Sequence, residues 1–292
     1  MTVEEGILLA RLTTIGTGGP AEAFARPRNV AELEHALRWA AERGLETRAV
    51  GLGSNLLAAD AGVNGLIVRL AGELADVSVQ GPLLTAGGGA TNAVCLHRAR
   101  AGGLGGFEFA CAIPGTTGGG VWMNAGAYGS DWSTILLRAL VVTANGSGWL
   151  SPTELGLSYR HSDLRPGQIV ARVECELKPR SATQIRRHVT ELVAQRKVTQ
   201  PTTKRTFGSV FKNPPGELGA GRLIELCGLK GHRVGGAVIS PVHANFIENA
   251  GGATSADCIA LMEEARRRVR EQHGVELEHE VVLLGALELS VP

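Results

Sequence analysis

Hydrophobic and polar positions along this chain follow two different periods, and the switches between them predict an α+β fold. Over 30–43, apolar residues recur every three or four positions, with Asn29 placed to cap a helix and Gly44 placed to end it. Over 168–177 the pattern alternates, which predicts a strand. Its apolar residues are expected to face one way: Ile169, Ala171, Val173, Cys175 and Leu177.

The same two periods predict the remaining elements. A capping-box pattern at 181–184 opens a helix that runs to about Lys197, and Gln200-Pro201 prevents its continuation. The other expected helices cover 91–101, 222–227 and 255–273. The other expected strands cover 47–50, 65–70, 83–86, 137–144, 244–248 and 280–287.

The Lys178-Pro179-Arg180 step indicates a boundary between two domains. A chain of 292 residues is long enough to form two cores. We therefore expect a first domain at 1–178, built from two lobes at about 1–71 and 72–178, and a smaller α+β domain at 179–292.

Glycine changes this picture, because 40 of the 292 residues are glycine, about twice the usual ~7%. The densest cluster lies in 113–129, where six glycines accompany two threonine hydroxyls and the amide of Asn124. Glycine permits positive φ and leaves backbone N–H groups uncovered, and successive bare N–H groups form concave anion sites. We interpret this segment as a binding loop for a phosphate-bearing ligand, most simply a dinucleotide.

Composition narrows the classes of partner. The net charge is +1, so no overall field favours nucleic acid or an anionic membrane, and we expect small-molecule substrates instead. No run of about 18 apolar residues and no signal-peptide pattern is present, so we expect a cytoplasmic protein. The sequence does not specify an oligomeric state and is compatible with a monomer.

Charged and sulfur side chains give no separate site. The arginine run at 266–268 lies in a helical pattern beside three glutamates, which predicts a solvated helix face. The five cysteines are widely separated and odd in number, so we expect buried thiols in a reducing compartment rather than disulfides or zinc. No His, Cys, Asp or Glu cluster has metal-ligand spacing, so no metal is expected.

The glycine turns do not form the dinucleotide fingerprint G-x-G-x-x-G, because 51–53 and 87–89 lack its third glycine. The turn at 51–53 is instead part of seven motifs along the chain that resemble, in order, those of the UDP-N-acetylenolpyruvoylglucosamine reductase (MurB) family. Three look like its flavin loops: 14–21, 51–57 and 113–129. Four look like its substrate and catalytic motifs: 158–162, 208–214, 243–249 and 277–281.

This resemblance implies a fold and a reaction. The fold is a two-subdomain FAD-binding module of the vanillyl-alcohol-oxidase type, followed by a substrate-binding domain. NADPH reduces non-covalently bound FAD, and reduced flavin then converts the enolpyruvyl ether of UDP-N-acetylglucosamine enolpyruvate to the lactyl ether of UDP-N-acetylmuramate, a peptidoglycan precursor. No substrate-covering insertion is present, so the compact form of the family is expected.

The resemblance also places a catalytic set on three residues. Arg160 would neutralise the charge that develops on the substrate carboxylate, because its planar fork matches a carboxylate. Ser209 would donate a proton to the adjacent carbon, and Glu280 would act as an acid or hydrogen-bond donor to the enolate. Each residue has a plain structural alternative: a surface arginine, a turn serine and a strand-end glutamate, with Glu278 as a competing candidate for the last role.

The remaining site residues follow from the same motifs. Tyr159, Lys212 and Asn213 are expected to contact substrate, although Tyr159 could equally be a core tyrosine. His243 is expected to be structural. The residues expected to contact FAD are Gly51, Gly53, Ser54, Asn55, Leu56, Gly115, Thr116, Thr117, Gly118, Gly119, Asn124, Gly126 and Ala127.

The chain departs from the family pattern at Leu52, at Phe207 and at Val282, which replaces a common basic residue. Two other functions remain open. One is an FAD oxidase of the same architecture, which would often tether flavin through a histidine; His97 is the one histidine between 35 and 161, and it lies in a helical pattern. The other is a non-catalytic module that binds a flavin or a UDP-sugar.

Overall fold

The computed structural model describes residues 2–289 and has the expected α+β character. Its helices are α1 (Val30–Ala41), α2 (Asn92–Ala101), α3 (Thr117–Trp122), α4 (Ala182–Thr199), α5 (Ala220–Leu226) and α6 (Ser255–His273). Its strands are β1 (Val3–Glu4), β2 (Ile7–Leu8), β3 (Pro20–Ala25), β4 (Thr47–Ala49), β5 (Leu56–Ala58), β6 (Val63–Val68), β7 (Val77–Gln80), β8 (Leu83–Gly87), β9 (Leu104–Gly105), β10 (Gly126–Ala127), β11 (Ser130–Asp131), β12 (Leu136–Thr143), β13 (Gly146–Leu150), β14 (Ile169–Glu176), β15 (Lys178–Pro179), β16 (Thr206–Ser209), β17 (Arg233–Val234), β18 (Ala237–Ile239), β19 (Phe246–Asn249) and β20 (Val282–Leu284).

The chain forms two compact units that are not continuous in sequence. Unit 1 consists of 2–5, Ala23–Leu52 and Asn64–Arg196, and unit 2 of Gly6–Glu22, Gly53–Val63 and 197–289. The glycine turn at 51–53 is therefore divided, with Gly51 in unit 1 and Gly53 in unit 2. This division by compactness differs from the division at 178 based on sequence pattern.

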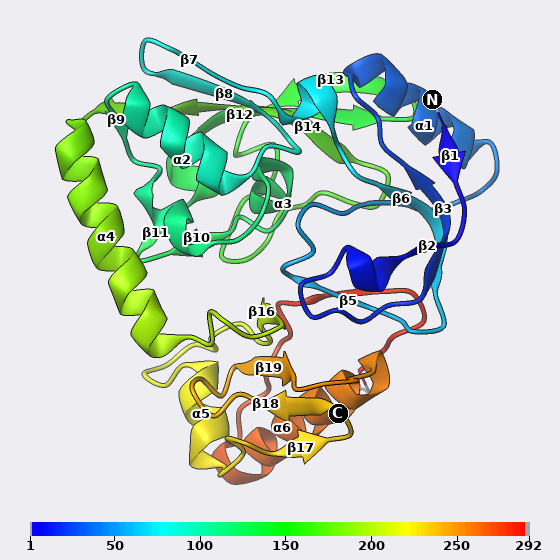
Figure 1. Cartoon of the computed structure of the whole chain (residues 1–292), viewed down its shortest axis with the longest axis vertical. Coiled ribbons are helices and arrows are strands. Elements are labelled where there is room, and N and C mark those ends of the chain that lie inside the picture. Colours follow the sequence, from blue (N-terminus) through cyan, green and yellow to red (C-terminus); the bar gives the residue numbers. More distant parts are fainter. Residues whose placement is uncertain (1, 290–292) are drawn as a thin grey trace. The chain divides into compact units, whose positions relative to one another are not determined.

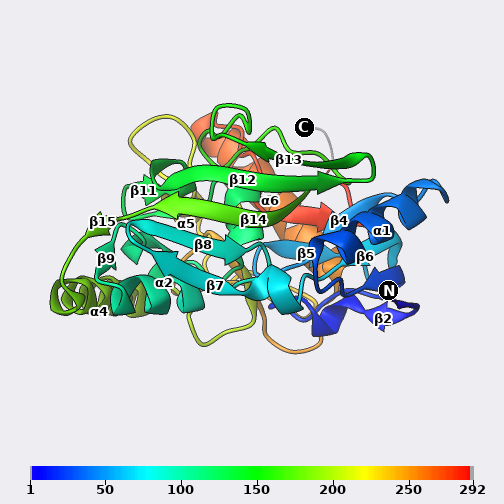
Figure 2. The ribbon, with the colours of Figure 1, turned by 90° about the horizontal axis from the view of Figure 1, so that it is seen from above.

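Unit 1 contains two larger sheets, besides the two-stranded pairs β10-β11 and β15-β9. In the first, the path β1-β3-β6-β4 is covered by α1, whose N-cap Asn29 accepts a hydrogen bond from the Glu32 N–H as expected. In the second, β13, β12, β14, β8 and β7 lie side by side, and α2 runs along β7 and β8 (Figure 2). The core beneath this sheet holds the fully buried ring of Trp132, edge-on to Phe107.

The central strand β14 corrects one expectation. Its alternating residues were expected to face one way, but Ile169 and Ala171 pack in the cluster under α1, whereas Val173 and Cys175 pack in the cluster around Trp132. The cause is a register shift, because β12 pairs with Arg172 and then with Val170, so Ala171 is skipped. A bulge of this kind changes the face to which later side chains point.

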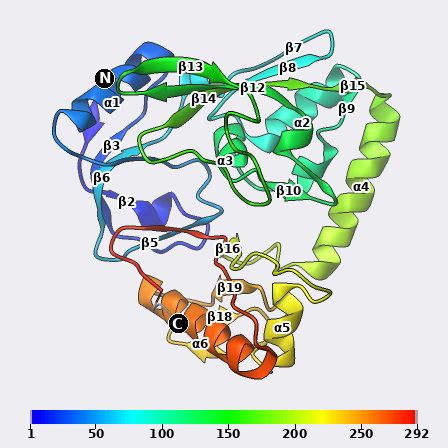
Figure 3. The ribbon, with the colours of Figure 1, turned by 180° about the vertical axis from the view of Figure 1, so that it is seen from behind.

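Unit 2 is built on the sheet β16-β19-β18-β17 (Figure 1). Helices α5 and α6 pack together on it, and α6 crosses β17 and β18 in the view from behind (Figure 3). Helix α6 has the expected bounds and a complete capping box formed by Thr254 and Asp257. The separate strand β5 pairs in parallel with β20, which joins the segment 53–63 to the end of the chain.

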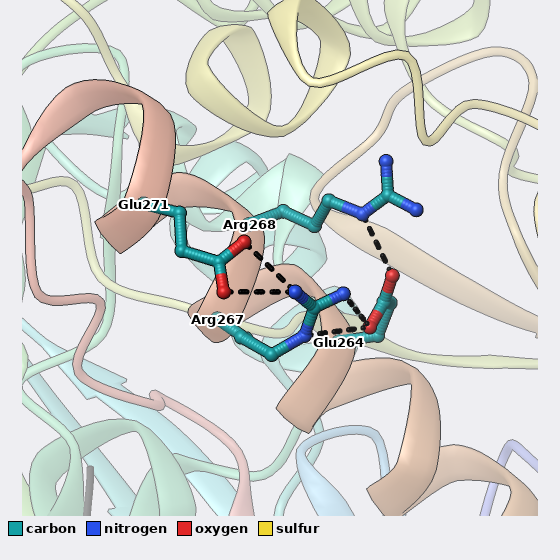
Figure 4. Close-up of polar contacts among 4 residues, drawn as sticks. All are labelled: Glu264, Arg267, Arg268 and Glu271. Atoms are coloured by element: carbon teal, nitrogen blue, oxygen red, sulfur yellow. Dashed lines mark hydrogen bonds and ion pairs between the residues drawn. The ribbon is translucent and has the colours of Figure 1, made fainter.

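In the arginine run on α6, Arg267 and Arg268 form the expected charged helix face and are ion-paired, whereas the Nε of Arg266 is buried. Arg267 bonds both Glu264 and Glu271, and Arg268 bonds Glu264 at 2.8 Å (Figure 4). These are pairs at helical spacings of three and four on one side of the helix, so the run adds local support to α6 rather than a site for a partner.

The cysteines also match expectation. All five are free, and four are buried, whereas Cys111 is half-buried. Burial raises the pKa of Cys95 and Cys258 to about 12, so these thiols stay protonated and unreactive at neutral pH. Among residues 2–289, no helix is long and apolar enough to cross a membrane.

Candidate functional site

The glycine-rich segment of unit 1 is not an open loop throughout, because it contains the short helix α3. Thr116 caps this helix through its side chain, which accepts from the Gly119 N–H. A Cβ at Gly51 would lie 2.5 Å from the Thr116 hydroxyl oxygen, so only glycine permits this approach of the two turns. The structure thus brings two predicted cofactor residues together, Gly51 and Thr116.

The backbone donors of this segment differ from the expectation of successive bare N–H groups. The N–H of Thr117 donates to the Ala90 carbonyl, and the N–H of Gly118 donates to the Gly88 carbonyl, both at 2.9 Å. Thr117 is fully buried, and its hydroxyl donates to the Gly87 carbonyl. These donors hold the turn in place, so the predicted anion nest cannot use them.

Asn124 is also committed to the protein itself. It is buried and has a φ of 39°. Its Oδ1 accepts from the Ser133 N–H, and its Nδ2 donates to the Ser158 carbonyl at 2.9 Å and to the Asp131 carboxylate at 3.2 Å. The side chain predicted to contact FAD therefore also fixes the turn that carries Arg160.

Arg160 lies in a tight turn closed by reciprocal backbone hydrogen bonds between Ser158 and His161. Its φ of 53° is unusual for a side chain of this size, and such conformations concentrate at functional sites. Its guanidinium donates to the Gly126 carbonyl at 2.7 Å and lies 5.0 Å from the ring centre of Tyr159. Tyr159 is 52% exposed, so the alternative of a core tyrosine is wrong.

Asn124→Asp is expected to lower the free energy of unfolding by about 2–4 kcal/mol. The substitution removes the Nδ2 donor and places a carboxylate against the Ser158 carbonyl and the Asp131 carboxylate. Aspartate tolerates positive φ about as well as asparagine, so backbone strain stays matched. Urea unfolding measures the change, with Asn145→Asp on the exposed β12–β13 hairpin as the control. If the two variants have the same free energy of unfolding, Asn124 does not fix this turn.

Unit 2 holds the other half of the divided glycine turn. Gly53 has a φ of 65°, and a Cβ there would collide with the backbone of Leu12 and Thr13. Thr14 fastens this turn, because its N–H donates to the Gly53 carbonyl and its hydroxyl donates to the Thr206 carbonyl at 2.6 Å. The turn that begins the predicted pyrophosphate contacts is therefore connected through Thr14 to β16, the strand of Ser209.

Asn55 connects the same turn to Glu280. Its Nδ2 donates to the Glu280 carbonyl at 3.1 Å, and its own carbonyl accepts from the Val282 N–H. Glu280 is half-buried, and its backbone N–H donates to the Val210 carbonyl at 2.8 Å. Unit 2 thus places Ser54, Asn55, Ser209 and Glu280 on neighbouring, mutually bonded segments.

A β-bulge orients Ser209. Three residue steps on β16, from Thr206 to Ser209, face two steps on β19, from Glu248 to Phe246, and Gly208 has a φ of 83°. Phe207 therefore points into the fully buried core of unit 2, whereas Ser209 pairs opposite Phe246. Ser209 is the last residue of a strand, so the alternative of a turn serine is wrong.

The predicted substrate residues Lys212 and Asn213 have partners of their own. Lys212 forms a 2.6 Å ion pair with Glu278, whose side chain is 70% exposed. Asn213 accepts from the Ala220 N–H at 3.0 Å and so holds the start of α5. Glu278 is thereby the ion-pair partner of Lys212, which separates its role from that of half-buried Glu280.

His243 is structural, as expected. Its Nδ1 accepts from the Asn245 N–H, and its ring packs edge-on against Phe246. Burial, and to a lesser extent nearby Lys230, lower its pKa, so the ring is neutral at physiological pH.

Three contributors to this site were not predicted from the sequence: Thr14, the Gly208 bulge and Asn245. Asn245 and Gly208 lie in motifs that were noted, but their roles depend on strand register. Arg196 was also missed; it bonds the Ala112 carbonyl just before the glycine segment, while the Tyr128 hydroxyl donates to the Leu192 carbonyl of α4. The sequence gives no signal for these two hydrogen bonds, because every residue has a backbone carbonyl that can accept them.

The residues present fit a nucleotide cofactor. A Cβ at Gly51 would collide with Thr116 and one at Gly53 with Leu12, whereas a Cβ at exposed Gly119 would meet only the Thr116 hydroxyl, at 3.6 Å. Asn92 holds the Ile113 carbonyl, and its buried Oδ1 has no hydrogen-bond partner among residues 2–289, which leaves an acceptor beside the turn. Thin glycine backbone with isolated polar groups is what close approach of a flat dinucleotide requires.

Comparisons with known proteins agree on one family. Residues 200–284 match the model of the UDP-N-acetylenolpyruvoylglucosamine reductase C-terminal domain, and residues 21–149 match an FAD binding domain. The UDP-N-acetylenolpyruvoylglucosamine reductase of Anaeromyxobacter dehalogenans (strain 2CP-C) is 46% identical over 95% of this chain and 84% of its own length. That of Myxococcus xanthus (strain DK1622) is 43% identical over 97% and 92%. The crystal structure of UDP-N-acetylenolpyruvylglucosamine reductase from Thermus caldophilus superposes with a TM-score of 0.85 at 39% identity, covering 97% of this chain and 99% of that one.

Proposed function

The chain belongs to the UDP-N-acetylenolpyruvoylglucosamine reductase family, and we propose that Ser209, Arg160 and Glu280 carry out the chemistry of that reaction in it. The protein is an FAD-containing, NADPH-dependent oxidoreductase of peptidoglycan precursor synthesis. Membership of this family favours the reductase over the FAD oxidase and the non-catalytic binding module, the two other functions that the sequence left open. His97, the candidate for a flavin tether in the oxidase alternative, lies on α2 beside Arg100.

The cofactor would be held by the glycine turn at 51–53, by the glycine-rich segment 115–119 and by the polar groups beside them. Gly51 and the segment 115–119, with Gly126 and Ala127, supply backbone in unit 1, and residues 53–56 supply it in unit 2. When bound, FAD takes a hydride from NADPH and delivers a hydride to the enolpyruvyl double bond.

Addition of a hydride and a proton across that double bond sets the tasks of the protein side chains. The hydride reaches the terminal CH₂ carbon, and the electron pair of the double bond moves toward the carboxylate. Arg160 neutralises this added negative charge with a planar fork that stays charged at any working pH. Its turn is fixed beforehand by Asn124 and by the bond to Gly126, so little reorganisation is needed during the reaction.

Ser209 donates its hydroxyl proton to the carbon next to the carboxylate, and Glu280 supports the developing enolate as a hydrogen-bond donor. A serine hydroxyl is a weak acid, so it acts well only when its orientation is fixed and the proton acceptor is close. The bulge at Gly208 and the backbone bond from Glu280 to Val210 supply this orientation. Tyr159, Lys212 and Asn213 contact the remainder of the UDP-sugar, with Lys212 paired to Glu278 until phosphate replaces it.

The observation that carries this proposal is the connection within unit 2. One cofactor turn, through Thr14 and Asn55, is hydrogen-bonded to the strand of Ser209 and to the backbone of Glu280. We keep the proposed functional division at 178, with FAD binding by 1–178 and substrate binding by 179–292. We propose a cytoplasmic location, which the free cysteines support.

Steady-state kinetics test the proposed use of one flavin by two substrates in turn. Varying NADPH and UDP-N-acetylglucosamine enolpyruvate should give parallel double-reciprocal lines, with inhibition by excess UDP-sugar, because both substrates are proposed to react at the same flavin face in turn. Intersecting lines would show that both substrates bind together and would contradict the proposal. An absorbance spectrum of the purified protein, before and after anaerobic NADPH, provides the control for flavin content.

A further inference from the structure

The side chain of Asn245 forms two hydrogen bonds with the backbone of Phe211, two residues after Ser209, as a neighbouring strand would. Its Nδ2 donates to the Phe211 carbonyl at 2.8 Å, and its Oδ1 accepts from the Phe211 N–H at 3.0 Å. The carbonyl of Asn245 accepts from the Val210 N–H at 2.9 Å. Asn245 is buried, so these bonds are shielded from water and a lost partner would be costly.

This contact lies where the regular pairing of the sheet stops. The ladder between β16 and β19 ends at the pair of Ser209 and Phe246, and the chain then leaves the sheet. Beyond that point the amide of Asn245 holds one side of the segment 210–212, and the backbone of Glu278 and Glu280 holds the other. The segment between Ser209 and Lys212 is therefore clamped from two sides, and one clamp is a single side chain.

We propose that Asn245 is a positioning residue for Ser209, which fixes the direction of the serine hydroxyl by clamping Phe211 two residues away. The inference rests on the proposed role of Ser209 as proton donor. It assigns Asn245 no contact with substrate or cofactor. Its effect on the reaction should consequently be confined to the step in which Ser209 gives up its proton.

The chemistry of the clamp requires both an acceptor and a donor on one short side chain. Asparagine supplies both, whereas an ionised aspartate supplies two acceptors and would repel the Phe211 carbonyl. A protonated aspartic acid again supplies one donor and one acceptor, in nearly the same shape. Burial raises the pKa of a carboxyl introduced here, because the charged form loses hydration. In Asn245→Asp, the two hydrogen bonds to Phe211 should therefore be lost at high pH and restored when the pH is lowered.

The experiment uses the FAD holoenzyme in anaerobic stopped flow. Asn245→Asp at pH about 8 should slow reoxidation of reduced flavin by UDP-N-acetylglucosamine enolpyruvate by roughly 10–100-fold, as expected for a misdirected acid. Flavin reduction by NADPH should stay within about twofold. Lowering the pH to about 6 should restore most of the reoxidation rate in this variant and not alter wild type in the same direction.

Two comparisons separate positioning from general loss of structure. Thr254→Ala removes the cap of α6, which destabilises unit 2 by about 1 kcal/mol without touching Phe211, and should leave the reoxidation rate unchanged. In a Ser209→Ala background, Asn245→Asp should add no further slowing, because both changes affect one proton transfer. Equal slowing in both backgrounds, or no slowing in either, would overturn the inference.

Failure of the proposed function itself has a different signature, because Ser209→Ala alone would then leave reoxidation unchanged. If Asn245→Asp yields no folded holoenzyme at pH 8, Asn245→Ser replaces it, alone and in the Ser209→Ala background. Serine keeps one hydrogen-bonding group but is too short to make both bonds to Phe211. Slowing in the wild-type background alone supports the inference, and equal slowing in both backgrounds, or no slowing in either, overturns it.

Discussion

Ser209→Ala should leave flavin reduction by NADPH intact and slow the reduction of the enolpyruvyl sugar by about 10²–10⁴-fold. The hydroxyl is needed only for proton delivery, so the first half-reaction does not depend on it. The substitution removes one oxygen from a half-buried position at the end of β16, and neither the bulge at Gly208 nor the core position of Phe207 requires that oxygen. The change should thus affect one rate and spare the fold.

Anaerobic stopped flow measures both rates separately in the same enzyme. Ser78→Ala on the exposed face of β7 is the matched control, because it removes the same atom from a strand without a proposed function. A variant that reoxidises normally, or one in which NADPH bleaches the flavin slowly, would show that Ser209 is not the proton donor.

Arg160→Lys should lower kcat by about 10²–10³-fold, with the flavin content unchanged. Lysine keeps the positive charge but lacks the planar fork that binds a carboxylate and donates to the Gly126 carbonyl. Both side chains are unbranched at Cβ and meet the same cost at a φ of 53°, so backbone strain is matched in this comparison.

The control for this variant is Arg165→Lys, an exposed arginine in the same connection between β13 and β14. It should keep wild-type kinetics. If Arg160→Lys raises KM and leaves kcat unchanged, the guanidinium contributes equally to substrate and transition-state binding, and its assignment to the developing charge is wrong.

Local signals in the sequence were sufficient for most helices. Asn29 caps α1, the capping box at 181–184 opens α4, and α6 has the expected bounds of Ser255 and His273. A cap and the residue that it bonds lie within four positions of each other, so the sequence contains the whole interaction. The short strands β16, β17 and β18 of unit 2 were not predicted, because their two to four residues do not sustain an alternation between apolar and polar.

Strand register was the feature that sequence could not supply. The bulge in β14 divides an apparently regular set of apolar residues between two cores, and the bulge at Gly208 turns Ser209 away from the core that holds Phe207. Each depends on the length and pairing of a partner strand far along the chain. For the same reason, nothing local indicated that 53–63 belongs with the C-terminal residues through β5 and β20.

The candidate site was identified by its motifs, but the motifs did not separate side chains that bind ligand from those that bind the protein backbone. Asn124 and Asn245 both occur in such motifs, and each uses both atoms of its amide on the chain itself. An amide has the same donor and acceptor in either role. Only the positions of the neighbouring carbonyl and N–H groups decide between them.

A crystal structure of the holoenzyme with UDP-N-acetylglucosamine enolpyruvate tests the central claim, which is that Ser209, Arg160 and Glu280 act on one substrate. The account predicts that the Arg160 guanidinium and the Ser209 hydroxyl both lie within hydrogen-bond reach, about 3 Å, of the enolpyruvyl group, with Glu280 beside them. An enolpyruvyl group contacted by other side chains, with Ser209 or Arg160 well outside that reach, would contradict it.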